Sequence, residues 1–141
     1  MRFRREDGAS AVEFALIAPL LFMLVFGIIG FGLAFLQVQS IRTAVREGGR
    51  AAATGTLKSN VQQQTVGASS GAIPSGQSVN VVVNPAGSSS VPPCNPQSIG
   101  SDVTVSYDTH NLPGGGVIVR IPLIPDIVMT PTITASFRCE V

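Results

Sequence analysis

The chain has 141 residues, of which 45% are hydrophobic and only 12% are charged, and its formal net charge is +1. This length allows about one small domain. Much of the apolar content lies in the first 40 residues and the remainder is rich in Ser, Gly and Pro, so a large enzymatic core is not expected. After residue 50 only Lys58, Arg120 and Arg138 are basic, which gives no clustered positive surface for nucleic acid.

An uncharged apolar stretch runs from Phe14 to Leu36. A helix of this length is about 35 Å long, against about 30 Å for the hydrocarbon core of a bilayer. The sequence therefore predicts a transmembrane helix at about residues 14–36. The alternative is a removed secretory signal, although the apolar region of such a signal usually has only about 7 to 15 residues. Gly32-Leu33-Ala34 would offer signal peptidase a small-x-small triplet.

Pro19 lies in the first third of this stretch, where it removes a backbone donor and crowds the carbonyl of Ala15, so a helix kink is expected there. Small residues form two stripes along the helix: Ala11, Ala15 and Ala18, and then Gly27, Gly30 and Ala34. Small residues let helices approach closely in lipid, so packing against another helix is predicted. An ordinary lipid-facing surface is the alternative.

The helix is predicted to continue outside the membrane to residue 54. Three arginines recur at every fourth residue and form one stripe of such a helix: Arg42, Arg46 and Arg50. Gly48-Gly49 weakens the helix, and Gly55 is placed to cap its end. The basic stripe is either solvated, anchored to lipid headgroups or in contact with a partner subunit.

Residues 55–141 are predicted to form a small head rich in β-structure. One or two helical turns are expected within residues 56–66, with Leu57 and Val61 facing inward, followed by a flexible connection. Alternating or clustered apolar residues predict short antiparallel strands that pack on the emerging helix, at residues 79–83, 102–108, 117–121 and 133–140. The apolar segment 122–131, broken by prolines, either covers a sheet edge or contacts another subunit.

Cys94 and Cys139 are the only cysteines, and they lie far from any CxxC or metal-ligand spacing. Such a pair suits a disulfide in an oxidising compartment. Closing a loop of about 45 residues would stabilise the fold by about 4 kcal/mol in the chain-entropy model. The charges on the two sides of the apolar stretch nearly balance, so the cysteines decide the orientation and place the head outside the cytoplasm. Two free buried thiols are the alternative.

Catalytic and metal-binding patterns are scarce. Residues 67–71 read G-x-S-x-G, but they lack the preceding apolar strand and the following helix of a nucleophile elbow. His110 is the only histidine and, with Asp102 and Asp108, fits no metal template. The sequence predicts neither an enzyme nor a cofactor or metal site.

Glu13 stands at the head of the apolar stretch, where an ionised carboxylate costs roughly 2.5 to 3.5 kcal/mol at the centre of the membrane. Gly8 lies five residues before it, behind the charged leader MRFRREDG. This spacing resembles the type III (class IV) prepilin signature. The resemblance implies cleavage between Gly8 and Ala9, and pairing between subunits through Glu13 and Phe14, with the new amine of Ala9 near the glutamate of a neighbour. The alternative is a glutamate that reaches interfacial water and is favoured by the helix dipole.

Residues 8–53 as a whole resemble the N-terminal segment of TadE-like minor pilins, also called pseudopilins, of Tad/Flp pilus systems. That family has a glycine, an early Glu-Phe, an Ala-x-x-Pro and an arginine near the end of a long helix. In this sequence these positions are occupied by Gly8, Glu13, Phe14, Pro19 and Arg50. Beyond residue 54 the resemblance is loose.

The expected architecture is α+β, with a prepilin-type leader at 1–8, a long helix at 9–54 and a small extracytoplasmic β-rich domain at 55–141. The resemblance implies a structural minor pilin that is processed by a prepilin peptidase and held as a single-pass protein in the cytoplasmic membrane. It would meet other pilins during Tad/Flp pilus assembly, either by entering the filament or by priming it. The alternatives are an unprocessed, membrane-anchored binding module and a small secreted hydrolase.

Overall fold

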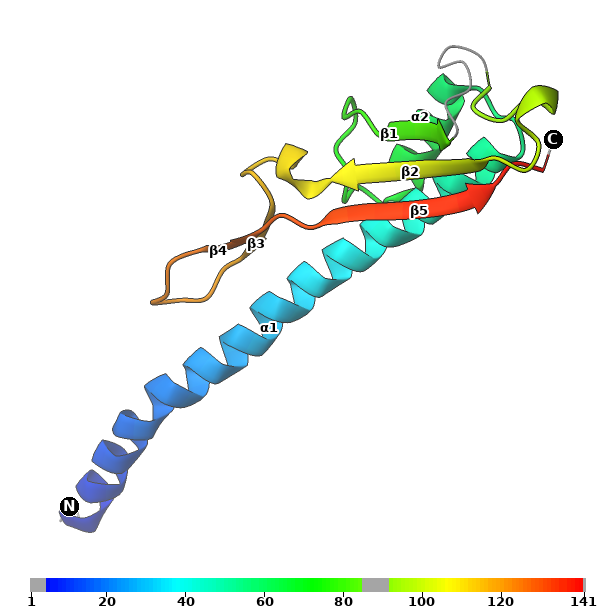
Figure 1. Cartoon of the computed structure of the whole chain (residues 1–141). Helices are drawn as coiled ribbons and strands as arrows, with labels where there is room; N and C mark the ends of the chain where they lie inside the picture. Colours follow the sequence, from blue (N-terminus) through cyan, green and yellow to red (C-terminus); the bar gives the residue numbers. More distant parts are fainter. Residues whose placement is uncertain (1–4, 85–91, 141) are drawn as a thin grey trace.

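One long helix carries the whole molecule, and a small head lies along the C-terminal half of that helix (Figure 1). The computed structural model describes residues 5–84 and 92–140. In chain order the elements are α1 (Arg5–Ala53), α2 (Lys58–Ala68), β1 (Asn80–Asn84), β2 (Asp102–Asp108), β3 (Val117–Val119), β4 (Ile127–Met129) and β5 (Thr132–Arg138). Two single 3-10 turns lie at Pro96–Ser98 and Thr109–Asn111. The predicted α+β class, with a long apolar helix before a small antiparallel sheet domain, is confirmed.

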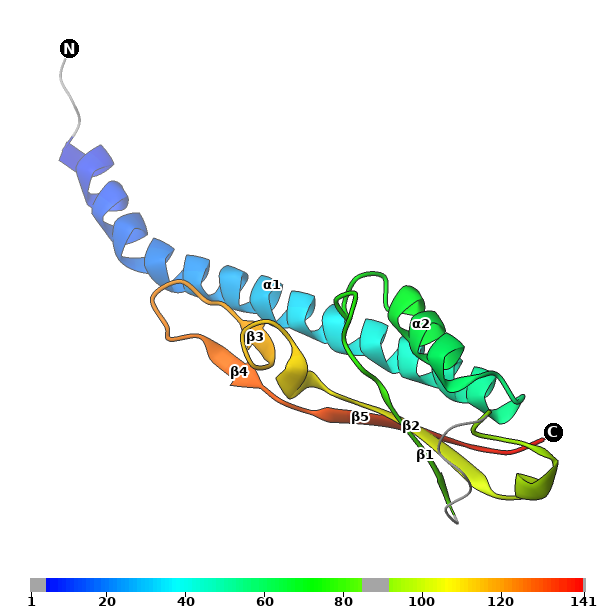
Figure 2. The same cartoon turned by 90° about the horizontal axis from the view of Figure 1, so that it is seen from above.

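Helix α1 begins at Arg5, four residues before the expected start, and runs without interruption through Pro19. Figure 2 shows that the N-terminal turns of α1 curve away from the line of the rest of the helix. A proline removes one hydrogen bond from a helix and favours such a bend. The position of a kink at Pro19 itself stays a prediction.

The C-terminal end of α1 is closed as the sequence predicts, through Gly55. The Gly55 amide donates to the Ala52 carbonyl at 3.2 Å, and the Thr56 amide donates to the Ala51 carbonyl at 3.2 Å. Gly55 has a φ of 79°, which glycine adopts without the penalty that other residues incur. These two bonds are the pair that defines a Schellman motif.

Helix α2 packs against the end of α1 and is longer than the one or two turns expected. Val61 and Thr65 are buried, but Leu57 is 52% exposed, so the prediction that Leu57 faces inward was wrong. Leu57 precedes the helix in an extended conformation, with ψ at 141°, and so does not share the face of Val61. In the connection after α2, the amide of buried Ile73 donates to Ser69 Oγ at 3.0 Å.

The head contains a three-stranded antiparallel sheet of order β1-β2-β5 and a separate β3–β4 hairpin. Strand β2 has the predicted bounds, and burial alternates along it, so Val103, Val105 and Tyr107 share one buried face. The face of β5 that carries Ile133 is likewise the more buried one. Strand β4 was not predicted, since it has only three residues and lies between two prolines.

The core of the head lies between this sheet and the two helices (Figure 2). Strands β2 and β5 both contact α1, and α2 covers the end of the same helix. The largest fully buried side chains come from all of these layers: Ile41, Val45, Val61, Val103, Val105 and Tyr107. The sheet thus fixes the head on the second half of α1, and the N-terminal turns of α1 extend beyond it.

Candidate assembly and membrane surface of the long helix

The N-terminal half of α1 exposes nearly every large apolar side chain it carries, from Val12 to Leu36. Within the described residues α1 is the single helix that is long and apolar enough to cross a membrane, and no part of its most apolar window is buried inside the chain. Burying apolar surface is favourable by roughly 25 cal/mol per Å². This half of the helix therefore fits a single-pass membrane anchor.

The residues of the prepilin-like signature lie on the first turns of this exposed helix. Gly8, Ala9, Glu13 and Phe14 are all exposed, and a side chain added at Gly8 would meet no atom within 4 Å. Ala9 and Glu13 are one turn apart and so lie on the same face of α1. The Gly8–Ala9 peptide bond itself lies inside the helix. The structure thus gathers the signature on one accessible helix end, and cleavage after Gly8 remains to be tested.

The two stripes of small residues differ in their surroundings. Ala11 and Ala15 are exposed and Ala18 is buried, so the first stripe is open at its first two positions. The second is covered by the β3–β4 hairpin of the same chain, since a Cβ at Gly30 would lie 2.9 Å from the Arg120 carbonyl oxygen, and Ala34 is buried. The expectation that the second stripe packs against another helix was wrong. Periodicity shows that a helix face is small, but it does not show what covers that face.

The basic stripe of Arg42, Arg46 and Arg50 lies on an exposed face of α1. Arg42 and Arg46 line a shallow cavity of about 270 Å³ together with residues 131–134 at the start of β5. Within the described residues the single ion pair joins Arg120 Nε to Asp126 Oδ2 at 3.5 Å, so none of the three arginines has a carboxylate partner there. A solvated face, a headgroup contact and a subunit contact all stay open.

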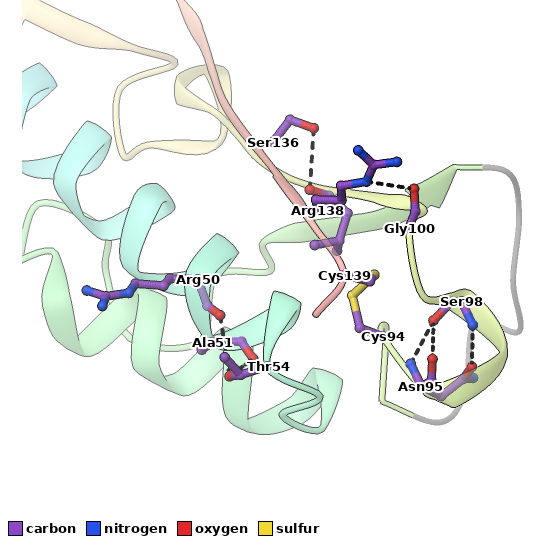
Figure 3. The surroundings of a disulfide bond; sticks show 11 residues. Arg50, Ala51, Thr54, Cys94, Asn95, Ser98, Gly100, Ser136, Arg138 and Cys139 are labelled. Atoms are coloured by element: carbon purple, nitrogen blue, oxygen red, sulfur yellow. Dashed lines mark hydrogen bonds between the residues drawn. A yellow bond between two sulfur atoms is a disulfide. The ribbon is translucent and has the colours of Figure 1, made fainter. Parts of the chain in front are cut away.

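A disulfide joins Cys94 to Cys139 at the end of the head, with their Cα atoms 5.4 Å apart (Figure 3). Both cysteines are buried. Nearby, the Cys139 amide donates to the Ser101 carbonyl at 2.8 Å, and the Glu140 amide donates to the Ala53 carbonyl at 3.2 Å. The disulfide and these bonds tie the end of the chain both to the segment before β2 and to the last turn of α1.

Tyr107, on β2, is the one polar core side chain left unsatisfied in the described part of the chain. Its hydroxyl is buried without a hydrogen-bond partner there. Burial raises the pKa of Tyr107 above its ordinary value, and the negative charge of Asp108 adds to the effect. The residue is a structural feature of the core, because the sheet face that carries it packs toward the helices.

The structure also shows where the G-x-S-x-G pattern and His110 lie. Residues 67–71 form the end of α2 and the turn after it, rather than a turn from a strand into a helix. His110 lies in an exposed turn, where its amide donates to Asp108 Oδ1 at 2.9 Å. No group of three or more potential metal ligands occurs among the residues that the structure describes.

The fold and the exposed apolar helix together define a class of protein. Its head consists of a sheet packed on helices, and one long helix that fits a membrane anchor carries this head. Residues 8–50 match the family model described as TadE-like protein, the family that the sequence resembles. That family is a structural, pilus-related one. The match lies within α1 and does not extend to the head. No curated protein and no solved structure matches the chain.

Proposed function

We propose that this chain is a minor pilin, or pseudopilin, that a prepilin peptidase cleaves between Gly8 and Ala9 and that takes part in Tad/Flp pilus assembly. The observation that carries the proposal is the placing of Glu13. It lies on an exposed face of α1, one turn after Ala9 and at the head of a helix half that the chain itself leaves almost uncovered. The match of residues 8–50 to TadE-like proteins supports the same function.

Cleavage would create a positively charged partner for the Glu13 carboxylate. Within the described residues Glu13 has no ion-pair partner, although an ionised carboxylate in lipid is costly. The amine released on Ala9 sits on the same face, and the amine of a neighbouring subunit would neutralise the carboxylate without water. Phe14 and the exposed residues Ala11 and Ala15 would pack between the same two helices.

The proposed location rests on the other half of the molecule. A Cys94–Cys139 disulfide persists in oxidising compartments, which supports a head outside the cytoplasm. The anchor then crosses the cytoplasmic membrane with the leader inside, where a prepilin peptidase has access to Gly8. Other pilins of a Tad/Flp pilus are the proposed partners of α1.

The mass of the mature N-terminus tests the processing step. The full chain is made in a host with a matching prepilin peptidase, extracted from membranes and analysed by mass spectrometry. We expect Ala9 at the N-terminus of the wild-type chain, and Met1 in Gly8→Val. Met1 on the wild-type chain would favour an unprocessed anchored binding module, a reading that the helical Gly8–Ala9 bond supports. An N-terminus near Phe35 would instead indicate signal peptidase.

Crosslinking between subunits tests the role of Glu13. The variant Glu13→Gln should still be cleaved and inserted, because a neutral amide enters lipid more readily than a carboxylate, but it should crosslink or co-purify poorly with other pilus subunits. Glu47→Gln is the matched control, since Glu47 is exposed on the same helix beyond the apolar half. Equal yields from Glu13→Gln, Glu47→Gln and the wild type at equal processing would show that Glu13 has only a local role.

A further inference from the structure

The β3–β4 hairpin reaches the half of α1 that is proposed to lie in the membrane. It runs from the head back along the helix toward the N-terminus (Figures 1 and 2). A Cβ at Gly30 would lie 2.9 Å from the Arg120 carbonyl oxygen, and one at Gly27 would lie 4.0 Å from Ile121 Cδ1. Both glycines fall inside the apolar stretch 14–36. The contact is therefore made beside the span and not above it.

The depth of this contact follows from the helix rise. A hydrocarbon core of about 30 Å that begins at Phe14 ends about 20 residues later, near residue 34. At about 1.5 Å per residue, Gly30 then lies about 6 Å below that boundary and Gly27 about 10 Å below it. These depths match the burial of about 5 to 10 Å that is typical of interfacial amphipathic segments.

The tip of the hairpin is apolar on its outside. Leu123 is 91% exposed, and Ile124, Ile127 and Val128 are exposed as well. Arg120 and Asp126 are the first and last residues of the loop between β3 and β4, and their charges pair with each other at 3.5 Å, so the one carboxylate within the tip has a cationic partner. Pro122 and Pro125 carry no backbone N–H, which leaves fewer donors to lose water when the segment enters lipid.

The backbone at Leu123 adopts a conformation that is unfavourable for a leucine. The Ile124 amide donates to the Ile121 carbonyl at 3.2 Å across Pro122 and Leu123, and Leu123 has a φ of 71°. A turn with proline first and a positive φ second normally places glycine or asparagine at that second position. Here the position holds a large apolar side chain, which points away from the chain. Strain that persists at an exposed site is an indication of function.

We propose that the hairpin tip, residues 122–128, inserts into the outer leaflet of the membrane beside α1. The ligand is the boundary between lipid headgroups and acyl chains, which continues the exposed apolar surface of α1 at the same level. The inference rests on the proposed membrane anchoring. The second contact holds the head against the bilayer and limits its rotation about the helix.

Position-specific fluorescence tests the insertion in the full chain. Leu123→Cys is labelled with an environment-sensitive NBD probe under non-reducing conditions, where the native cysteines are joined to each other. The protein is reconstituted in phosphatidylcholine–phosphatidylglycerol vesicles, with and without acyl-brominated lipid. Val128→Cys gives a second probe on the hairpin. Leu24→Cys reports on the span, and Ser59→Cys, exposed on α2, reports on the aqueous face of the head.

We expect brominated lipid to quench the Leu123 and Val128 probes several-fold more than the Ser59 probe, and iodide to show the opposite order. Hairpin probes that iodide reaches as easily as it reaches Ser59, while brominated lipid quenches Leu24, would overturn the insertion and leave the anchor intact. Loss of quenching at Leu24 as well would overturn the anchoring. Protection of the hairpin that grows with the ratio of protein to lipid would show a second copy as its cover, and would also refute the inference.

Discussion

Replacing Gly48 by alanine should destabilise the head, although alanine is the better helix former by about 1 kcal/mol. A Cβ at Gly48 would lie 3.1 Å from Thr65 Cβ and would overlap the Thr65 hydroxyl. That hydroxyl donates to the Val61 carbonyl at 2.7 Å in the buried contact between α1 and α2. Overpacking costs about 1 to 3 kcal/mol. A buried hydroxyl that loses its acceptor costs about 1 to 3 kcal/mol more. The net loss is therefore about 1 to 5 kcal/mol, once the gain in helix propensity is subtracted.

The fluorescence of Tyr107 during urea unfolding measures this loss in the detergent-solubilised chain. Tyr107 is the only tyrosine, the chain has no tryptophan, and the residue is buried in the head, so the signal is free of the membrane helix. Gly67→Ala is the matched control, because Gly67 lies in α2 with nothing within 4 Å of the added Cβ. It should raise stability by up to about 1 kcal/mol. If Gly48→Ala unfolds at the same urea concentration as Gly67→Ala, the close contact at Thr65 does not exist in solution.

Two further predictions concern the same head. The double variant Cys94→Ala/Cys139→Ala should lower the free energy of unfolding by about 4 kcal/mol, because the disulfide closes a separation of 45 residues. Reductant should destabilise the wild type but not the variant. Reaction of both wild-type thiols in non-reducing denaturant would contradict the disulfide. Tyr107→Phe should retain stability at alkaline pH. The pKa of Tyr107 is raised in the folded state, so its contribution to folding stability is complete below the pKa of the unfolded chain, near 10. That contribution is lost as pH rises through the pKa of the folded state, and the wild type alone should show this loss.

The elements that the sequence predicts well are those with a strong local pattern. The uncharged stretch from Phe14 to Leu36 and the periodicity after it give α1, and the alternation at residues 102–108 gives β2 with its observed ends. Gly55 is identified because helix ends have specific chemistry. Strand β4 depends on pairing with β3 over a loop of prolines, and three residues carry too little periodicity to predict it.

The glycines of α1 show why the rest could not be predicted. On propensity alone Gly48-Gly49 weakens the helix. In the structure other elements approach the helix closely at both residues, since a Cβ at Gly48 would overlap Thr65 and one at Gly49 would lie 2.6 Å from Phe137 Cδ2. Propensity is a local property, whereas these contacts join residues far apart in the chain. For the same reason the sequence predicted another helix as the partner of the Gly27 and Gly30 stripe, whereas the β3–β4 hairpin packs there.

The occupied stripe also restricts how this chain can meet other helices. The hairpin covers Gly30, and Ala34 is buried, so a neighbouring helix cannot reach the backbone of α1 on that face. The exposed residues of the two small-residue stripes are Ala11 and Ala15, on the same first turns as Glu13. Close packing in lipid needs small residues, and a buried carboxylate needs a partner, so both requirements select one short segment of α1 for contacts between subunits. Ala15→Leu should then lower crosslinking between subunits as Glu13→Gln does, whereas Gly32→Leu, at an open position beside the hairpin, should leave it unchanged.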